Sequence, residues 1–285
     1  MNDEDASRTA RQMWTLWEPV HTVTYFTPEA RAAFEAAGLR GFWRGYFAGR
    51  SAPLGATAAA PVTAAFFTFA PSMVGRALPD VWGLITPAEA LRAREQGAVA
   101  ALGRLLAGLE EAVAVAADML AAVVAGLDCS GRVLASANAA LALPAEPAAR
   151  LWQAATLLRE HRGDGHFAAL LTAGLDGCEA NVLRAGLDIP RETLQPIRGW
   201  SDEQWEQAAG RLAGRGLLAA DGKATPAGAS LLAEAERITD AAASRPWLDR
   251  QFAADLAVVL YPIAKACAAE TPAINPVGVP APEAQ

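Results

Sequence analysis

The sequence is poor in cysteine, in strand-forming residues and in the segments that direct a chain to a membrane. Its three cysteines, Cys129, Cys178 and Cys267, are odd in number and widely spaced, which argues against a disulfide framework or a zinc knuckle. They are typical of reduced thiols in a cytoplasm. The first twenty residues lack the basic start and apolar centre of a signal peptide, and Asp118 interrupts the apolar run 112–127. We therefore expect a soluble, cytoplasmic protein without a membrane partner.

The common catalytic signatures are also missing. The chain has no Gly-x-Ser-x-Gly elbow, no phosphate-binding loop and no Rossmann glycine pattern, so nucleophilic hydrolysis and nucleotide binding lack their usual support. Its net charge of −7 weighs against broad electrostatic attraction to nucleic acid or to anionic membranes, although a local basic patch is compatible with it. The sequence identifies no cofactor.

What the chain has in abundance is alanine and other apolar residues. With 285 residues, 53% of them hydrophobic, it can bury a substantial core and form two domains. Abundant alanine and scarce strand-formers favour a mainly α fold. The expected organisation is a disordered start at 1–12, an N-terminal helical domain at 13–145, a second domain at 146–268 and an extended tail at 269–285.

The densest polar cluster lies at 159–166. These eight residues contain two of the three histidines, two arginines, two carboxylates and two glycines, and leucines and Phe167 flank them. Such flanks indicate that the cluster lies in or beside a core, where ionisable groups need partners. On a helical period Arg159, Arg162 and His166 share one stripe with Trp152, whereas His161 points away. The glycines predict either one helix or a broken pair of helices over 148–174.

A second group of candidate residues lies near the N-terminus. Trp14, Trp17, His21 and Tyr25 form one stripe of a helix over 13–25, which favours a core face with a hydrogen-bonded histidine and leaves ligand binding as the alternative.

The following glycine-rich segment, 41–55, carries its glycines four residues apart. This spacing allows another backbone or a flat ligand to approach closely, and helix packing is the commoner reason for it. Arg50 ends this helix and either clamps an anion or caps the helix C-terminus. Tyr46, Phe66 and Phe69 are candidates for the wall of a pocket, with core packing as the alternative.

The histidines suggest two kinds of chemistry. A site with all three as metal ligands is disfavoured, because His161 and His166 are five residues apart and no cysteine lies nearby. Acid–base chemistry is better supported: Asp164 or Glu160 would orient one of these histidines as the catalytic group.

In this hypothesis Arg50, Arg159 or Arg162 would bind an anionic group of the substrate. The competing interpretation is a buried network of arginine, carboxylate and histidine that joins the two domains.

The C-terminal half shows a different pattern. Ser201 and Gln204 predict a capped helix that ends near residue 215, and Asp221-Gly222 predicts the turn of a small β-hairpin over 217–225. A further helix is expected over 226–239. The order helix, helix, hairpin, helix is the layout of a winged helix-turn-helix.

These residues carry a family resemblance. Trp205, Arg211-Leu212, Arg215-Gly216-Leu217-Leu218 and Thr225-Pro226-Ala227-Gly228 resemble the winged-helix half of MarR-like regulators. The chain is more closely similar to a group of actinobacterial proteins known as helix-turn-helix proteins, in which segments 17–21, 41–55 and 158–166 look like recurring blocks. The resemblance covers 13–250 and implies a winged helix, which ordinarily binds DNA.

The charges argue against that use of the fold. Asp202, Glu203 and Glu206 open the presumed recognition helix and would repel phosphates, and the hairpin tip offers only Lys223. From 198 to 228 four basic residues are matched by four acidic ones.

We therefore expect a scaffold that has lost DNA binding and binds a small organic molecule, either as a binding protein or as an acid–base enzyme of specialised metabolism. A MarR-like, homodimeric regulator that responds to a ligand and a purely structural or partner-binding helical protein are the alternatives.

Overall fold

A computed structural model describes residues 3–279 and 281–282 of the chain. Its described part contains fourteen α-helices and three short 3-10 helices and no strand, so the expectation of a mainly α fold is confirmed. Three hydrophobic clusters hold the helices together, one around the centre of the molecule and one in each of two lobes.

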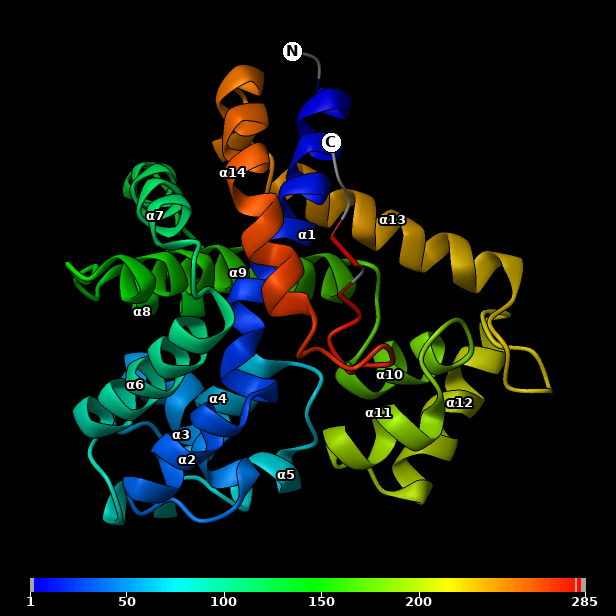
Figure 1. The fold of residues 1–285 in the computed structure, drawn as a ribbon. Coiled ribbons are helices and arrows are strands. Elements are labelled where there is room, and N and C mark those ends of the chain that lie inside the picture. The colour runs from blue at the N-terminus through cyan, green and yellow to red at the C-terminus, as the bar shows by residue number, and fades with distance from the viewer. Residues whose placement is uncertain (1–2, 280, 283–285) are drawn as a thin grey trace.

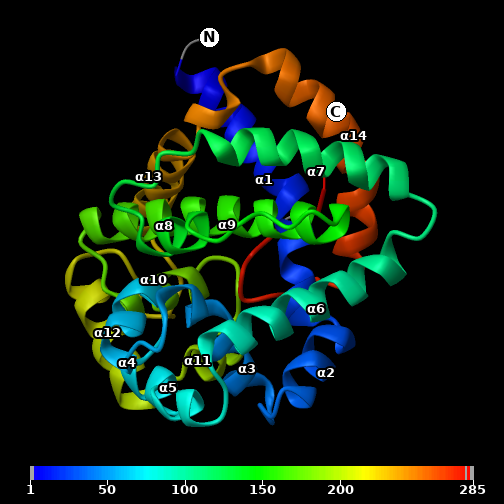
Figure 2. The same ribbon diagram turned by 90° about the vertical axis from the view of Figure 1, so that its left-hand side faces the viewer.

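The central cluster is built around α9 (Pro147–Thr172), which crosses the middle of the molecule (Figure 1). α1 (Asp3–Phe26) and α14 (Arg250–Ala268) run past it side by side, while α7 (Glu110–Ala125) packs along it and α6 (Pro87–Leu105) crosses it on the other side (Figure 2). The shared core is made of alanines, leucines and tryptophans from all five helices. It joins elements from both ends of the sequence.

The first lobe consists of short helices that follow α1. They are α2 (Pro28–Ala36), α3 (Phe42–Ser51), η1 (Ala52–Leu54), α4 (Ala59–Phe66), α5 (Pro71–Gly75), η2 (Asp80–Gly83) and, from later in the chain, α8 (Val133–Ala139). Helix packing explains two of the three spaced glycines of α3. A Cβ atom would lie 2.8 Å from the ring of Phe34 at Gly45 and 2.5 Å at Gly49, and Gly41 is the N-cap with a φ of +85°.

The second lobe contains the helix-turn-helix segment. It comprises α10 (Gly177–Ala185), α11 (Arg191–Arg198), α12 (Asp202–Gly214) and α13 (Pro226–Ala242), and η3 (Arg245–Trp247) leads on to α14. The capping box predicted for α12 is present: the Ser201 hydroxyl accepts from the Gln204 backbone N–H, and the Gln204 side chain accepts from the Ser201 backbone N–H.

The β-hairpin predicted over 217–225 is wrong as a pair of strands. Within the described residues this loop makes a single antiparallel bridge, between Leu218 and Ala224, with the Ala219 N–H donating to the Lys223 carbonyl at 2.8 Å. The Asp-Gly turn itself forms, with Gly222 at a φ of +80°. The described residues offer no further strand to pair with so short a hairpin, and an isolated two-stranded ribbon is only marginally stable.

The structure also bears on the start of the chain and on the glycines of the polar cluster. The sequence predicts a disordered start at 1–12, but α1 begins at Asp3, because Ala6 and Ala10 extend its buried face; residues 1 and 2 lie outside the described part. Of the two alternatives left open for 148–174, the structure has the single helix, and the glycines of the polar cluster do not break α9. At Gly165 a Cβ atom would lie 2.5 Å from the guanidinium of Arg132, so this glycine makes room for a neighbour rather than a turn.

α14 is the one described helix whose length and apolar composition would suffice to cross a membrane, and core helices of globular proteins meet the same criterion. One of its faces is buried against α1. The chain beyond α14, whose sequence predicts an extended tail, turns back between the two lobes (Figure 1). Asn275 is buried there and its side-chain oxygen accepts from the backbone N–H groups of Val277 and Gly278.

Candidate ligand-binding cavity

A cavity of about 850 Å³ lies where α1, α3, α9, α11, α13 and the C-terminal segment 272–278 meet. This volume is within the range of pockets that hold small organic molecules. Aromatic rings form much of its wall, namely those of Trp14, Tyr25, Phe26, Phe42, Trp43, Tyr46, Phe69 and Phe167. The cavity can therefore surround a largely apolar or aromatic molecule.

The polar part of the wall is dominated by arginine. Six arginines line the cavity against three carboxylates, those of Glu18, Asp188 and Glu236; the arginines are Arg11, Arg50, Arg159, Arg162, Arg184 and Arg198. In a protein with a net charge of −7, such a local excess of positive charge has to be explained by what each guanidinium binds.

Arg50 is neutralised by Glu160 from α9. The two side chains are almost fully buried and form a bidentate pair with N–O distances of 3.0 and 3.1 Å, and Arg50 also donates to the Tyr46 hydroxyl at 3.1 Å. Burial alone would raise the pKa of Glu160, but Arg159 and Arg50 outweigh it and hold that pKa at about 2. This pair links the first lobe to α9, as the buried-network interpretation of the sequence predicts.

Arg159 shares the same carboxylate. Its Nη1 donates to Glu160 at 2.7 Å, and its Nε lies 3.9 Å from a carboxylate oxygen of Glu18 on α1. Burial raises the pKa of Glu18, with Arg159 acting against it, and the indole N–H of Trp14 donates to the same carboxylate at 3.1 Å. The two carboxylates and two arginines therefore balance one another when Glu18 is ionised.

Arg162 is also already paired. Together with Arg11 it forms a closed cluster with Glu236 and Asp240 of α13, with four N–O distances between 2.6 and 3.1 Å. Both guanidinium groups also lie over the ring of Trp14, at 5.2 and 4.7 Å from its centre. The cluster ties α1, α9 and α13 together.

Arg198 is different, and the sequence does not single it out as a site residue. Its Nη2 donates to the backbone carbonyl of Pro276 at 2.8 Å, its guanidinium lies 4.6 Å from the centre of the Phe69 ring, and its Nε is buried without a partner. Among the described residues no carboxylate pairs with it. Its position as the last residue of α11 gives no sign of this role in the sequence, because the cavity is formed by segments distant in sequence.

The predicted catalytic histidines are in separate places. His166 lies on the cavity wall, where its Nδ1 is 3.0 Å from the Thr239 hydroxyl. That hydroxyl donates to the Ala235 carbonyl, so His166 donates through Nδ1, and its Nε2 has no hydrogen-bond partner among the described residues. Burial lowers the pKa of His166 to about 4. The nearby Arg162 also lowers this pKa, whereas Glu236 raises it, and the ring is neutral at pH 7.

His161 points away from the cavity, as its position on the helical period predicts. Its Nε2 donates to the Asp128 carbonyl at 3.2 Å, and burial together with Arg132 lowers its pKa to about 4. His21 lies between Thr156 and the Tyr25 hydroxyl, each 3.0 Å from one of its ring nitrogens. The aromatic stripe of α1 therefore does hold a hydrogen-bonded histidine.

The predicted pairing of a histidine with Asp164 or Glu160 is wrong. Asp164 accepts the backbone N–H groups of Leu134 and Ala135, both at 2.9 Å, at the start of α8, and Glu160 binds arginines. An unbroken helix directs these side chains to different neighbours, whereas a break at the glycines would have allowed them to converge. The described residues contain no group of three or more His, Cys, Asp or Glu side chains arranged to hold a metal ion.

A second, much smaller cavity of about 30 Å³ adjoins the first. Tyr25, Tyr46 and Arg50 line both cavities, whereas His21 and Glu160 line only the smaller one, which has room for about one water molecule. Of the two phenylalanines predicted to wall a pocket, Phe69 lies on the large cavity. Phe66 is buried behind it, with the Arg50 guanidinium 4.0 Å from its ring centre.

The fold and the site define an all-helical protein whose helix-turn-helix lobe closes one side of a cavity large enough for a small molecule. The chain belongs to a helix-turn-helix family, whose model matches residues 10–273. That range includes both lobes and the central helices. No curated protein and no solved structure matches the chain.

Proposed function

We propose that this protein binds a small, largely apolar organic molecule in the cavity between its two lobes. The observation that carries this proposal is the cavity itself, about 850 Å³ lined by aromatic rings from α1, α3, α9 and the segment before α5. Trp14 and Trp43 lie on its wall, so a bound aromatic molecule would change tryptophan fluorescence. His166 is the one predicted catalytic residue on this wall, and its free Nε2 would be the base available to a reactive ligand.

The neutral fluorescent probe N-phenyl-1-naphthylamine tests this proposal. We expect it to bind with a stoichiometry of one, with energy transfer from tryptophan. Gly163 of α9 lies on the cavity wall, and a Cβ atom there would meet only the Arg159 side chain, at 3.8 Å. Gly163→Leu should therefore fill part of the cavity without straining the helix and should weaken probe binding.

Gly210→Leu is the matched control, because Gly210 is an exposed glycine inside α12 with nothing within 4 Å of a Cβ atom. It should leave probe affinity unchanged. Failure of the wild-type protein to bind the probe, or equal loss in both variants, would refute the proposal.

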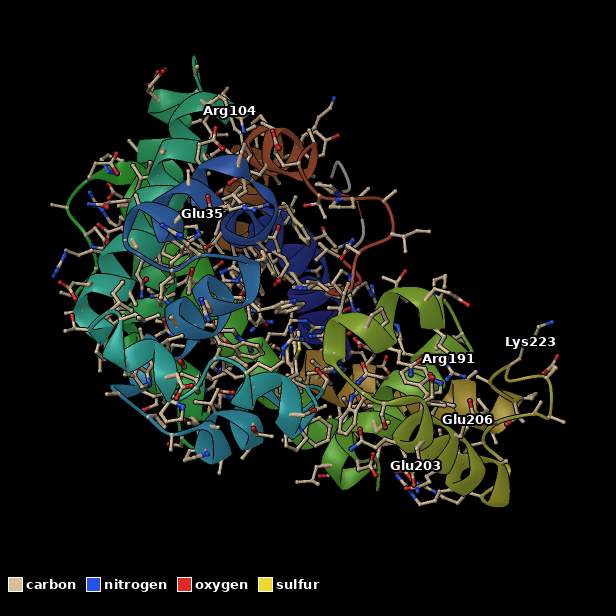
Figure 3. The ribbon with its side chains drawn as sticks, turned by 90° about the horizontal axis from the view of Figure 1, so that it is seen from below. Glu35, Arg104, Arg191, Glu203, Glu206 and Lys223 are labelled. Carbon is tan, nitrogen blue, oxygen red and sulfur yellow. The ribbon has the colours of Figure 1, made fainter. Side chains whose placement is uncertain are left out.

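We further propose that α12 does not bind DNA, although the family and the helix-turn-helix layout of this lobe are those of DNA-binding proteins. Arg191 is paired with Asp202 and Glu206 at 3.1 and 2.6 Å, and Lys223 lies 3.6 Å from Asp221. Figure 3 shows Arg191, Glu203 and Glu206 gathered on the outer surface of the lobe, with Lys223 at the tip of the loop. Arg211 is paired as well, with Asp176 and Glu179. Cations held by carboxylates in this way are not free for phosphates.

A mobility shift with random-sequence and genomic duplexes at two salt concentrations tests the DNA-binding alternative. We expect no salt-sensitive complex with the wild-type protein. Tight, sequence-selective binding that weakens steeply with salt would instead support a MarR-like, ligand-responsive regulator, in which the same cavity holds the effector.

A further inference from the structure

We infer that the molecule bound in the cavity is an organic acid whose anionic group pairs with Arg198. This inference rests on the proposed binding function and adds the chemical class of the ligand. It starts from a difference among the six cavity arginines. Five of them have a carboxylate partner among the described residues, and Arg198 has none.

The neighbours of Arg198 give it no compensation. The cations that act on Arg198 are Arg50 and Arg159, whose two positive charges are matched by Glu160 and, when it is ionised, by Glu18. Arg198 adds a third positive charge to these two pairs; its side chain is half-buried with the Nε atom shielded from solvent, and a shielded cation without a counter-ion is costly. One negative charge in the cavity would balance the group.

The surroundings of Arg198 are suited to hold such a charge. The Phe69 ring covers one face of the guanidinium, and the Pro276 carbonyl occupies only one of its five N–H groups. The buried Nε of Arg198 has no partner, and its Nη1 makes no hydrogen bond among the described residues, so the guanidinium can still offer N–H groups to a carboxylate or sulfonate. The aromatic wall would then surround the apolar body of the acid.

Two probes that differ in one group test this inference. N-phenyl-1-naphthylamine and 8-anilinonaphthalene-1-sulfonate share the same rings, and only the second carries an anion. We expect wild-type protein to bind the anionic probe more tightly than the neutral one. Arg198→Met should weaken the anionic probe about 10- to 100-fold and leave the neutral probe unchanged. Arg198→Lys should retain part of the preference, because it keeps the charge and loses the forked geometry.

The controls separate the ligand class from the site. Arg237→Met, which removes an exposed arginine of α13 that is paired with Glu234, should change neither probe. Equal binding of both probes by wild-type protein, or an anion preference that persists in Arg198→Met, would refute the inference while leaving the cavity as a binding site. Failure of both probes to bind would refute the proposed function itself. If Arg198→Met does not fold, Arg198→Lys decides: a preference smaller than that of wild-type protein supports the inference, and an unchanged preference refutes it.

Discussion

At the scale of single residues, the cavity is organised by how arginines are paired. The sequence predicts that Arg50, Arg159 and Arg162 gather near the polar cluster, and the structure places all three on the cavity wall. The sequence does not predict which carboxylate each arginine binds, because Glu160 is 110 residues from Arg50 and Glu236 is 74 residues from Arg162. For the same reason Arg198 was missed: a missing partner becomes visible only in three dimensions.

Glu160 is expected to be the most sensitive of these residues for stability. Glu160→Gln removes the charge that compensates the buried Arg50 and the half-buried Arg159, and should cost about 3–5 kcal/mol in the free energy of unfolding. Urea denaturation measures the loss. Glu234→Gln, which breaks an exposed pair with Arg237, serves as the control and should cause little change. A similar small effect for both variants would contradict the role given to Glu160.

The two histidines of α9 predict a dependence of stability on pH. Both have a pKa of about 4 in the folded protein, below the ordinary value of 6.5, so the unfolded chain takes up protons first as the pH falls. The two histidines contribute fully to the free energy of unfolding above pH 6.5, and this contribution is lost as the pH falls toward 4. The loss is about 2 kcal/mol per histidine between pH 7 and pH 5.

The difference in the free energy of unfolding between wild-type protein and His166→Gln isolates the contribution of His166. It cancels that of Asp164, whose pKa is raised to about 6 by burial and whose contribution to stability increases as the pH falls. The free energies of unfolding of the two proteins, measured in urea from pH 5 to pH 7, should converge as the pH falls. Parallel curves would show that the pKa of His166 is not lowered.

At the scale of helices and loops, the sequence predicts best what local chemistry decides. The cap of α12 at Ser201 and the turn at Gly222 follow from short-range rules and are confirmed. Of the two alternatives for 148–174, the structure shows one helix, because neighbouring helices pack against α9. The predicted strands of the hairpin are wrong, because no third strand among the described residues supports them. Packing thus overrides local propensity in both places.

Contact between the lobes depends on Gly177, the first residue of α10. A Cβ atom there would lie 2.0 Å from the Phe67 carbonyl oxygen, next to the Thr68 carbonyl that accepts from Asn181 and Trp200. Gly177→Ala should therefore separate the two lobes and cost at least about 1–3 kcal/mol by thermal or urea unfolding.

Gly210→Ala is the control for this change, because it introduces the same methyl group into an open position of α12. It should stabilise the protein by up to about 1 kcal/mol, through helix propensity alone. If Gly177→Ala were equally harmless, the lobes would not be held by this contact.

At the scale of the whole molecule, the cavity is assembled from parts that lie far apart in the chain. Its walls come from α1, from the first lobe, from α9, from the helix-turn-helix lobe and from the segment after α14. Periodicity indicates which face of each helix is polar, but not which faces meet. The sequence therefore predicts some wall residues of α1, α3 and α9, such as Tyr25, Arg50 and Arg162, and misses those of α10, α11, α13 and the C-terminal segment. The result is a helix-turn-helix lobe that serves as one wall of an interior site.

The C-terminal segment closes this site and gives the last prediction. Pro272, Ile274, Pro276 and Val277 line the cavity, and the Pro276 carbonyl accepts from Arg198. A chain truncated after Thr271 should release N-phenyl-1-naphthylamine faster than the wild-type chain, by stopped-flow dilution, because one wall of the cavity is gone. Its melting temperature should change little, since most of the buried apolar residues lie in the three helical clusters. Truncation after Pro282 leaves this segment in place and should release the probe at the wild-type rate; equal rates for both truncations would show that the segment does not cover the bound molecule.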